Sequence, residues 1–323
     1  MLPLPPATWL TRSFFIVAFL ICQFQALETN AQQKTRELYK AIQQNNLALV
    51  QKLATKKNIN QPDEYGDYPI MNAALYSSID IMKVLLEKGA DPNAKNKDGE
   101  TALMWSVQDP EKIKLLISYD ADVNLVAHSG NTALLIASVG NNQFSTIKYL
   151  VDHGADPLAK NKKQETCLMR AALFGDTTTA SYLVRSGIEI NAKDTIGGTA
   201  LINAIFNVNR PVTLWLLNNG ADPDLRSVFG LTAVSGVVTY NDLPSIKAVL
   251  QKTNNVNAID DGGVSALMWA VYNEHDNPEI ISLLLDKGAD VHHKAKDGST
   301  ALMWAMKKGN TKTVDLLKKA GAR

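Results

Sequence analysis

One short motif returns along the chain at nearly constant spacing, and it limits the possible folds more than any other feature. Thr-Ala-Leu and its close variants recur at intervals of 31, 34, 33, 33, 33 and 35 residues, and Tyr68-Pro-Ile stands 33 residues before the first of them. Such a period is typical of a repeat array, in which each unit packs only on its neighbours. A chain of 323 residues therefore needs no single central core. The seven later copies begin at Thr101, Thr132, Thr166, Thr199, Thr232, Ser265 and Thr300.

A second mark keeps the same register later in each unit. Gly89-Ala-Asp recurs at Gly154, Gly220 and Gly288, with Asp120-Ala-Asp and Gly187-Ile-Glu as variants. A Thr can cap a helix that begins with small apolar residues, and a glycine can end a helix in the left-handed conformation. Between the two marks, apolar residues recur at helical spacing, as in Ile81, Val84 and Leu85. Each unit is therefore predicted to form two helices joined by a short turn.

These motifs resemble the ankyrin repeat, whose first helix opens on a Thr-Pro-Leu-His-like motif, and the resemblance runs from about Thr35 to Arg323. Ala usually replaces the Pro, and the Ala-Leu-Met-Trp form is similar to the bacterial branch of the family. The resemblance implies an all-α solenoid of helix pairs with hairpin-like loops. Residues 32–62 are predicted to be an N-terminal helical capping repeat, and residues 63–323 eight repeats, the last a C-terminal cap. Met stands at the family's His position at Met71, Met104, Met169, Met268 and Met303.

The first 31 residues have the pattern of a secretory signal peptide. Arg12 precedes an apolar run from Phe14 to Cys22, and small residues lie before a cleavage point after Ala31. The run is shorter than the roughly 20 residues that span a bilayer, so a retained anchor is the weaker alternative. We therefore expect a periplasmic or secreted protein with no membrane insertion after cleavage.

The charge and cysteine content of the chain limit the kinds of partner that we expect. The chain has 33 basic and 32 acidic side chains, which gives no general attraction to nucleic acid. Cys167 is the only cysteine left after signal cleavage, so no internal disulfide can form, and its place among alanines predicts a small buried packing residue. We expect a monomer whose partner is another protein.

Resemblance to ankyrin repeats implies a concave groove, made by the hairpin tips and the exposed side of each first helix, that grips a protein partner. At these positions the sequence places aromatic and aliphatic residues where solvated positions normally favour charge. The alternative is that these side chains only cover neighbouring repeats. The candidate partner-binding residues are Tyr65, Tyr76, Phe174, Ile196, Phe206, Val228, Phe229, Leu231, Tyr240, Val264 and Tyr272.

No motif predicts catalysis, a cofactor or a metal. His292-His293 could suggest a metal site, but no further His or Cys stands at ligand spacing. Trp105, Trp269 and Trp304 recur in register, which favours packing between repeats over a cofactor site, and Trp215 is predicted to lie in the core. The sequence predicts a non-catalytic, exported protein-binding scaffold. A secreted effector or toxin-neutralising protein is the first alternative, and a metal-dependent enzyme is a second, weaker one.

Overall fold

The computed structural model describes residues 32–272 and 276–323, so the predicted signal peptide lies outside the described residues. Within those ranges the secondary structure is helical, and the only β-type pairing consists of isolated β-bridges. The all-α prediction is thereby confirmed. The chain divides into two compact units, Met1–Leu125 and Val126–Arg323, here called unit 1 and unit 2.

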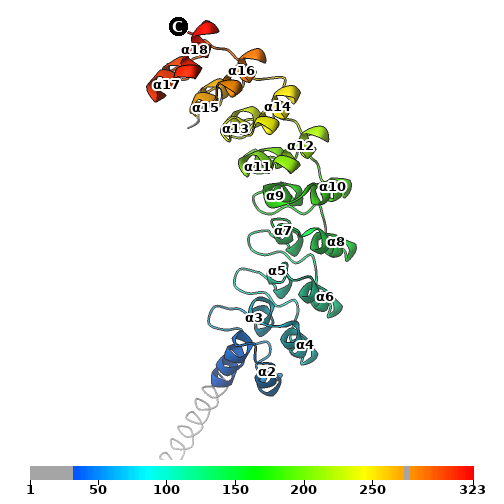
Figure 1. The fold of residues 1–323 in the computed structure, drawn as a ribbon. Coiled ribbons are helices and arrows are strands. Elements are labelled where there is room, and N and C mark those ends of the chain that lie inside the picture. Colours follow the sequence, from blue (N-terminus) through cyan, green and yellow to red (C-terminus); the bar gives the residue numbers. More distant parts are fainter. Residues whose placement is uncertain (1–31, 273–275) are drawn as a thin grey trace, which may run out of the picture. The chain divides into compact units, whose positions relative to one another are not determined.

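Unit 1 contains three successive helix pairs (Figure 1). A helix over residues 32–43 pairs with α2, and α2, α4 and α6 stack on one another, as do α3 and α5. The Tyr39 hydroxyl fixes the first pair to the loop before α3, because its single O–H lies within hydrogen-bond distance of two carbonyl oxygens, those of Gln61 (2.9 Å) and Asp67 (2.6 Å). The helices are α2 Leu47–Leu53, α3 Pro69–Tyr76, α4 Ile79–Glu87, α5 Ala102–Trp105 and α6 Pro110–Ser118.

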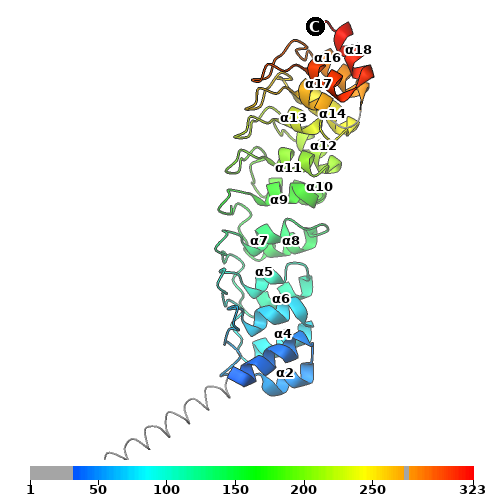
Figure 2. The ribbon, with the colours of Figure 1, turned by 90° about the vertical axis from the view of Figure 1, so that its left-hand side faces the viewer.

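Unit 2 contains six further pairs in two parallel rows (Figure 1). The first helices α7, α9, α11, α13, α15 and α17 form one row, and the second helices α8 to α18 form the other. Figure 2 shows the loops of this unit projecting to one common side of the helices. The helices are α7 Ala133–Ala137, α8 Phe144–Asp152, α9 Cys167–Phe174, α10 Thr177–Arg185, α11 Ala200–Phe206, α12 Arg210–Asn218, α13 Ala233–Val237, α14 Leu243–Lys252, α15 Ala266–Tyr272, α16 Pro278–Asp286, α17 Ala301–Lys308 and α18 Thr311–Lys319.

The repeated Thr or Ser starts the first helices, as predicted. Its hydroxyl accepts a hydrogen bond of 3.2–3.4 Å from the backbone N–H three residues later, which satisfies one of the free donors of the first turn. The Ala and Leu that follow are buried and allow close stacking of neighbouring helices. The residues that cap in this way are Thr101, Thr132, Thr166, Thr199, Ser265 and Thr300.

The predicted helix ends are also confirmed. The glycines that close the second helices at Gly89, Gly154, Gly220 and Gly288 have φ between 92° and 95°. A second series of glycines stands at the hairpin tips, two residues before the Thr-Ala-Leu motif, as at Gly130 and Gly197. Gln164 takes the place of this glycine in one repeat and keeps its left-handed conformation, with φ of 60°. The backbone path is therefore constant even where the glycine is lost.

Backbone hydrogen bonds join the hairpin tips of unit 2 into a ladder. In each bond, an N–H of one tip donates to a carbonyl of the tip before it, at 2.9–3.1 Å. Because the same bond recurs from loop to loop, the tip side chains are held in a fixed row. The five donor–acceptor pairs are Lys162–Ser129, Thr195–Lys163, Val228–Ile196, Asp261–Phe229 and Lys296–Gly262.

Two predictions about single residues have different outcomes. Cys167 is fully buried at the start of α9, as its alanine-like position indicated. Trp215 is only half-buried on α12, so its assignment to the core was wrong. The adjacent Leu216 and Leu217 fill the core instead, because their side chains leave the helix on the face toward the neighbouring helices.

Candidate protein-binding surface

The predicted partner-binding residues divide between the two units. Tyr65, at a hairpin tip, and Tyr76, at the end of α3, belong to unit 1 and are both exposed. The other nine belong to unit 2, and we call them the aromatic surface. It consists of Phe174, Ile196, Phe206, Val228, Phe229, Leu231, Tyr240, Val264 and Tyr272.

Four aromatic rings of this surface come from equivalent places on successive first helices. Phe174, Phe206 and Tyr272 are the last residues of α9, α11 and α15, and Tyr240 lies three residues beyond α13. The rings of Phe206 and Tyr240 meet edge to face, with centroids 6.1 Å apart. Stacking of the first helices therefore places the rings in a row, as the register of the repeat predicted.

The hairpin tips contribute the remaining members. Ile196, Val228 and Phe229 are exposed, and the ladder fixes their spacing, because Val228 N–H donates to Ile196 C=O at 2.9 Å. Leu231 and Val264 each lie two residues before the first helix of their repeat, α13 and α15, and are half-buried, so they line the base of the tips more than they project from them. The seven exposed members keep between 40 % and 58 % of their surface accessible. About half of the surface of each of these residues is therefore open to a partner.

Tyr272 ends the aromatic row beside a positive charge. Its ring contacts the indoles of Trp269 and Trp304 edge to face, at centroid distances of 5.9 and 6.0 Å. The Lys308 ammonium lies 4.3 Å from the centre of the Tyr272 ring and also donates a hydrogen bond to the Tyr272 carbonyl. Trp269 in turn donates from Nε1 to Asp260 at 3.0 Å. Of these contacts, the one between Tyr272 and Trp304 joins two successive repeats, which supports the predicted packing role for Trp304.

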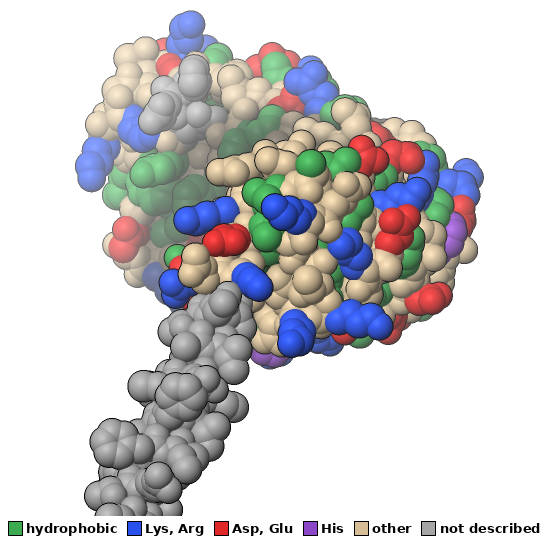
Figure 3. Space-filling model, turned by 90° about the horizontal axis from the view of Figure 1, so that it is seen from below, with side chains coloured by type: hydrophobic (Ala, Val, Ile, Leu, Met, Phe, Trp, Pro, Cys, Tyr) green, Lys and Arg blue, Asp and Glu red, His purple; other side chains and the backbone are tan. Residues whose placement is uncertain are grey.

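The first helices that carry these rings have almost no charged side chains. α11, α13 and α15 carry no charged side chain, and the one on α9 is Arg170. Arg170 is paired, since its Nη1 lies 2.9 Å from a carboxylate oxygen of Glu165. Figure 3 shows a group of hydrophobic side chains on one part of the visible surface, and smaller ones between the charged side chains elsewhere. An uncharged strip of this kind suits burial against an apolar partner.

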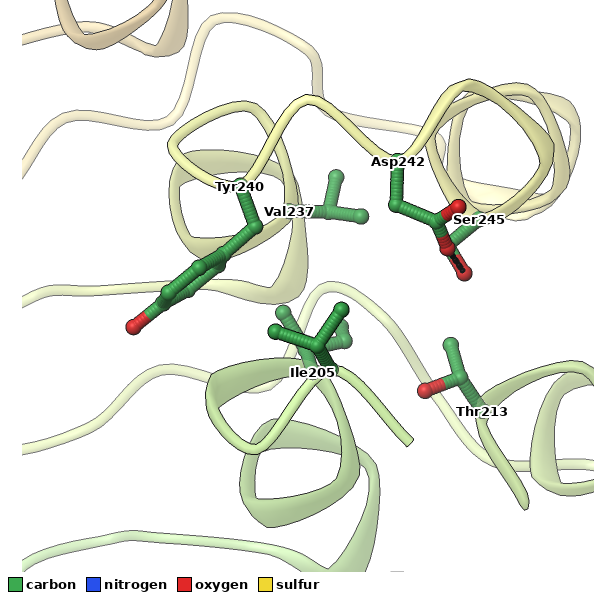
Figure 4. Close-up of a pocket in the computed structure, with 7 residues that line it drawn as sticks. Ile205, Thr213, Val237, Tyr240, Asp242 and Ser245 are labelled. Atoms are coloured by element: carbon green, nitrogen blue, oxygen red, sulfur yellow. Dashed lines mark hydrogen bonds between the residues drawn. The ribbon is translucent and has the colours of Figure 1, made fainter. Parts of the chain in front are cut away.

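A small polar site lies behind the aromatic row. Asp242 and Ser245 from the start of α14 face Thr213 of α12, while Tyr240 points away from them on the other side of Ile205 and Val237 (Figure 4). The enclosed space holds about one water molecule. It is therefore no substrate pocket.

The Asp242 carboxylate is already fully engaged. It accepts hydrogen bonds from Arg210 Nε at 2.7 Å and from the Ser245 hydroxyl at 2.5 Å. Burial acts to raise its pKa, but these hydrogen bonds and the guanidinium charge outweigh burial and hold the pKa below its ordinary value. The pair joins two successive repeats and is structural in character.

The reactive residues singled out in the sequence do not converge on a site. Within the described residues, no three His, Cys, Asp or Glu side chains are close enough to hold a metal ion. His293 is occupied, with Nε2 2.7 Å from the Gly263 carbonyl oxygen. Burial raises the pKa of the Cys167 thiol to about 11, which keeps it protonated and unreactive at neutral pH.

Some exposed apolar residues were missed by sequence reasoning. Met303 and Met306 on α17 and Val208 after α11 are as exposed as the predicted members. Met303 occupies the position at which Met71, Met104, Met169 and Met268 are buried in earlier repeats. No further repeat of the described chain stacks on α17 to cover it. The position of Met303 in the last repeat was the sequence signal that could have predicted its exposure.

Comparison with protein families gives one clear result. The model for ankyrin repeats in groups of three matches overlapping stretches from residues 12–96 to residues 233–323, which together include most of the chain. The chain belongs to the ankyrin repeat family. Ankyrin repeats serve in general as non-catalytic modules for protein–protein interaction, so this ankyrin chain is in its general role an interaction scaffold.

Individual relatives share parts of this ankyrin array. An ankyrin repeat protein of Acanthamoeba polyphaga mimivirus is 34% identical over 149 residues, which is 38% of this chain and 26% of the relative. The human transient receptor potential cation channel subfamily A member 1 is 32% identical over 131 residues, 39% of this chain and 12% of the channel. The mitochondrial disaggregase of Bos taurus is 28% identical over 141 residues, 42% of this chain and 21% of that protein. The similarity thus spans about a quarter or less of each of these proteins.

None of the helices in the described residues combines the length and the apolar character needed to cross a bilayer.

Proposed function

We propose that this ankyrin chain binds a partner polypeptide in a groove lined by the aromatic surface of unit 2. The observation that carries the proposal is the row of exposed rings on uncharged first helices, from Phe174 on α9 to Tyr272 on α15. Aromatic side chains lose little conformational entropy on binding and dominate the energetics of many interfaces. The ladder of tip hydrogen bonds supports the same reading, since it fixes the spacing of the tip side chains before a partner arrives.

Removal of two rings tests the surface directly. Phe229→Ala and Tyr240→Ala should each weaken partner binding by about 1–2 kcal/mol, because each removes exposed apolar area from the interface. Leu158→Ala is a matched control, because Leu158 is equally exposed but lies outside the aromatic surface. Thermal melting by circular dichroism would be measured beside partner capture for each variant. Lost stability with undiminished capture would assign both rings to packing and refute the proposal.

We further propose that the protein is exported from a bacterial cell and acts in the periplasm or outside it. The basic, apolar and small-residue pattern of residues 1–31 and the Ala-Leu-Met-Trp form of the repeat motif support this proposal. The relatives named above are viral and eukaryotic, so the proposal depends on the sequence of this chain alone. Expression of the full chain in a Gram-negative cell, followed by fractionation and N-terminal sequencing, tests it. A start at Gln32 in the periplasmic fraction is expected, and an uncleaved chain in the cytoplasm would contradict the proposal.

A further inference from the structure

We propose that the segment bound by the aromatic surface carries apolar side chains followed by Asp or Glu, whose carboxylates lie against Lys307 and Lys308 of α17. This inference rests on the proposed function and adds the chemistry and the placement of the partner. It concerns unit 2 alone.

The first support is the contact that ends the aromatic row. Lys308 lies over the Tyr272 ring, 4.3 Å from its centre, and its ammonium donates to the Tyr272 carbonyl. These two contacts hold the ammonium at the end of the row while leaving the side chain exposed. An ammonium has three N–H donors, so one bond to a carbonyl leaves capacity for a carboxylate. A segment lying on the rings would therefore meet a prepositioned positive charge.

The second support is the distribution of charge along unit 2. Among the first helices of unit 2, α17 carries Lys307 and Lys308 and no acidic side chain. By contrast, α11, α13 and α15 have no charged side chains. The charge thus changes sharply from neutral to basic where the first helices pass from α15 to α17. Met303 and Met306 are exposed on α17 beside Lys307 and Lys308, so apolar and basic groups lie together there.

Charge complementarity then selects the partner. A basic segment would be repelled by Lys307 and Lys308, and charged groups placed over the uncharged rings would lose hydration without gaining a partner. A segment that is apolar over the rings and acidic over α17 avoids both costs. The acidic end also sets the direction in which the partner lies, since opposite placement would put its carboxylates against Phe174 and Phe206.

A displayed library of random 16-residue peptides, selected on the full chain, provides the probe. We expect the enriched peptides to combine aromatic or aliphatic residues with Asp or Glu at one end. Synthetic versions should lose about thirtyfold or more in affinity to the double variant Phe206→Ala, Tyr240→Ala. Lys307→Glu should cost about five- to tenfold, whereas Lys252→Glu on α14, with the same change in net charge, should leave affinity unchanged. Peptides with Lys in place of the acids should recover affinity on Lys307→Glu.

Each alternative outcome has a distinct meaning. Peptides that depend on Phe206 and Tyr240 but show no acidic preference would overturn this inference and leave the proposed function standing. Failure to enrich any peptide that depends on those rings would overturn both. Affinity that vanishes when the peptide C-terminus is amidated would identify a terminal carboxylate instead of Asp or Glu side chains. Lys307-dependent binding to vesicles containing phosphatidylglycerol, without binding to acidic peptides, would identify a lipid surface and also refute the inference.

Discussion

Replacing Gly130 with alanine tests the close approach of the hairpin tips that underlies the aromatic surface. Gly130 has φ of 84°, and its tip is held by the bond from Lys162 N–H to Ser129 C=O. A Cβ added at Gly130 would lie 2.5 Å from the Lys162 nitrogen and 2.9 Å from the Asn161 carbonyl carbon. These are backbone atoms, which cannot move aside as the end of a flexible side chain can.

The expected cost in free energy of unfolding has three contributions. An alanine at positive φ costs about 1–2 kcal/mol in any surroundings. Relief of the clash requires the two tips to move apart, which costs about 1–3 kcal/mol in strain. Loss of the hydrogen bond between Lys162 and Ser129 adds about 1 kcal/mol. The Gly130→Ala variant should therefore lose about 3–6 kcal/mol in free energy of unfolding.

Gly154→Ala is the matched control for the conformational part. Gly154 has φ of 92°, and among the described residues nothing lies within 4 Å of its added Cβ. It should lose only about 1–2 kcal/mol. Both glycines belong to unit 2, so urea unfolding of the full chain, followed by circular dichroism at 222 nm, compares them in one transition. With a urea dependence of about 2 kcal/mol per molar, their midpoints should differ by about 1–2 M.

Equal midpoints for the two variants would refute the reasoning, because they would show that the tips separate without cost. A second reading is hydrogen exchange at the Lys162 amide. Exchange there should accelerate in Gly130→Ala and stay unchanged in Gly154→Ala. Retained protection at Lys162 in a strongly destabilised Gly130→Ala would assign the loss to strain elsewhere.

Two further predictions concern contacts between repeats. Asn191 accepts from Asp222 N–H (2.9 Å) and donates to the Gly220 carbonyl (3.1 Å), whereas Leu158 stands at the equivalent place one repeat earlier. In urea titrations, Leu158→Asn should raise the free energy of unfolding by about 1 kcal/mol, and Asn191→Leu should lower it by about 1–2 kcal/mol. Changes of the same sign for both variants would contradict a stabilising role of the Asn side chain between repeats. Asp242→Asn should cost about 1–2 kcal/mol at pH 7, because a neutral amide accepts the hydrogen bonds of Arg210 and Ser245 less strongly than the carboxylate does, while the half-exposed Arg210 guanidinium keeps its hydration. Because the folded-state pKa of Asp242 lies below its ordinary value of 3.8, the folded state binds fewer protons, so the wild-type advantage is full near neutral pH and is lost as the pH falls below 3.8. Melting of both proteins between pH 7 and pH 2.5 checks this, and an undiminished difference at pH 2.5 would contradict it.

The repeat register was predictable from sequence because each of its marks has a local cause. The hydroxyl of Thr166 caps α9 through a bond to the Met169 N–H, and Gly154 ends α8 in a conformation that other residues adopt at a cost. Both effects operate within a few residues of the chain. Their periodic recurrence then fixes which helix lies beside which, since sequential repeats are neighbours in a solenoid.

Exposure was harder to predict, because it depends on the neighbouring repeat and not on the residue's own unit. Leu231 and Val264 were grouped with the tip residues, yet the structure leaves them half-buried. Met303 has the same local sequence as Met268, but it is 55% exposed where Met268 is buried. The sequence pattern within one repeat cannot tell a buried side chain from an exposed one, since the atoms that cover the side chain come from residues about 33 positions away.

The same dependence bears on how the aromatic surface can bind. The rings of Phe206 and Tyr240 belong to adjacent repeats and touch each other, and so do the rings of Tyr272 and Trp304. Each ring is thus supported on one side by its neighbour and open on the other, which reduces the entropy that it must lose when a partner covers it. Because nearest-neighbour contacts also provide the stability of a repeat array, the contacts that hold the stack together preorganise the row of rings for binding. A substitution at one ring should therefore weaken the contribution of its neighbour, and double-variant losses at Phe206 and Tyr240 should fall short of the sum of the single losses.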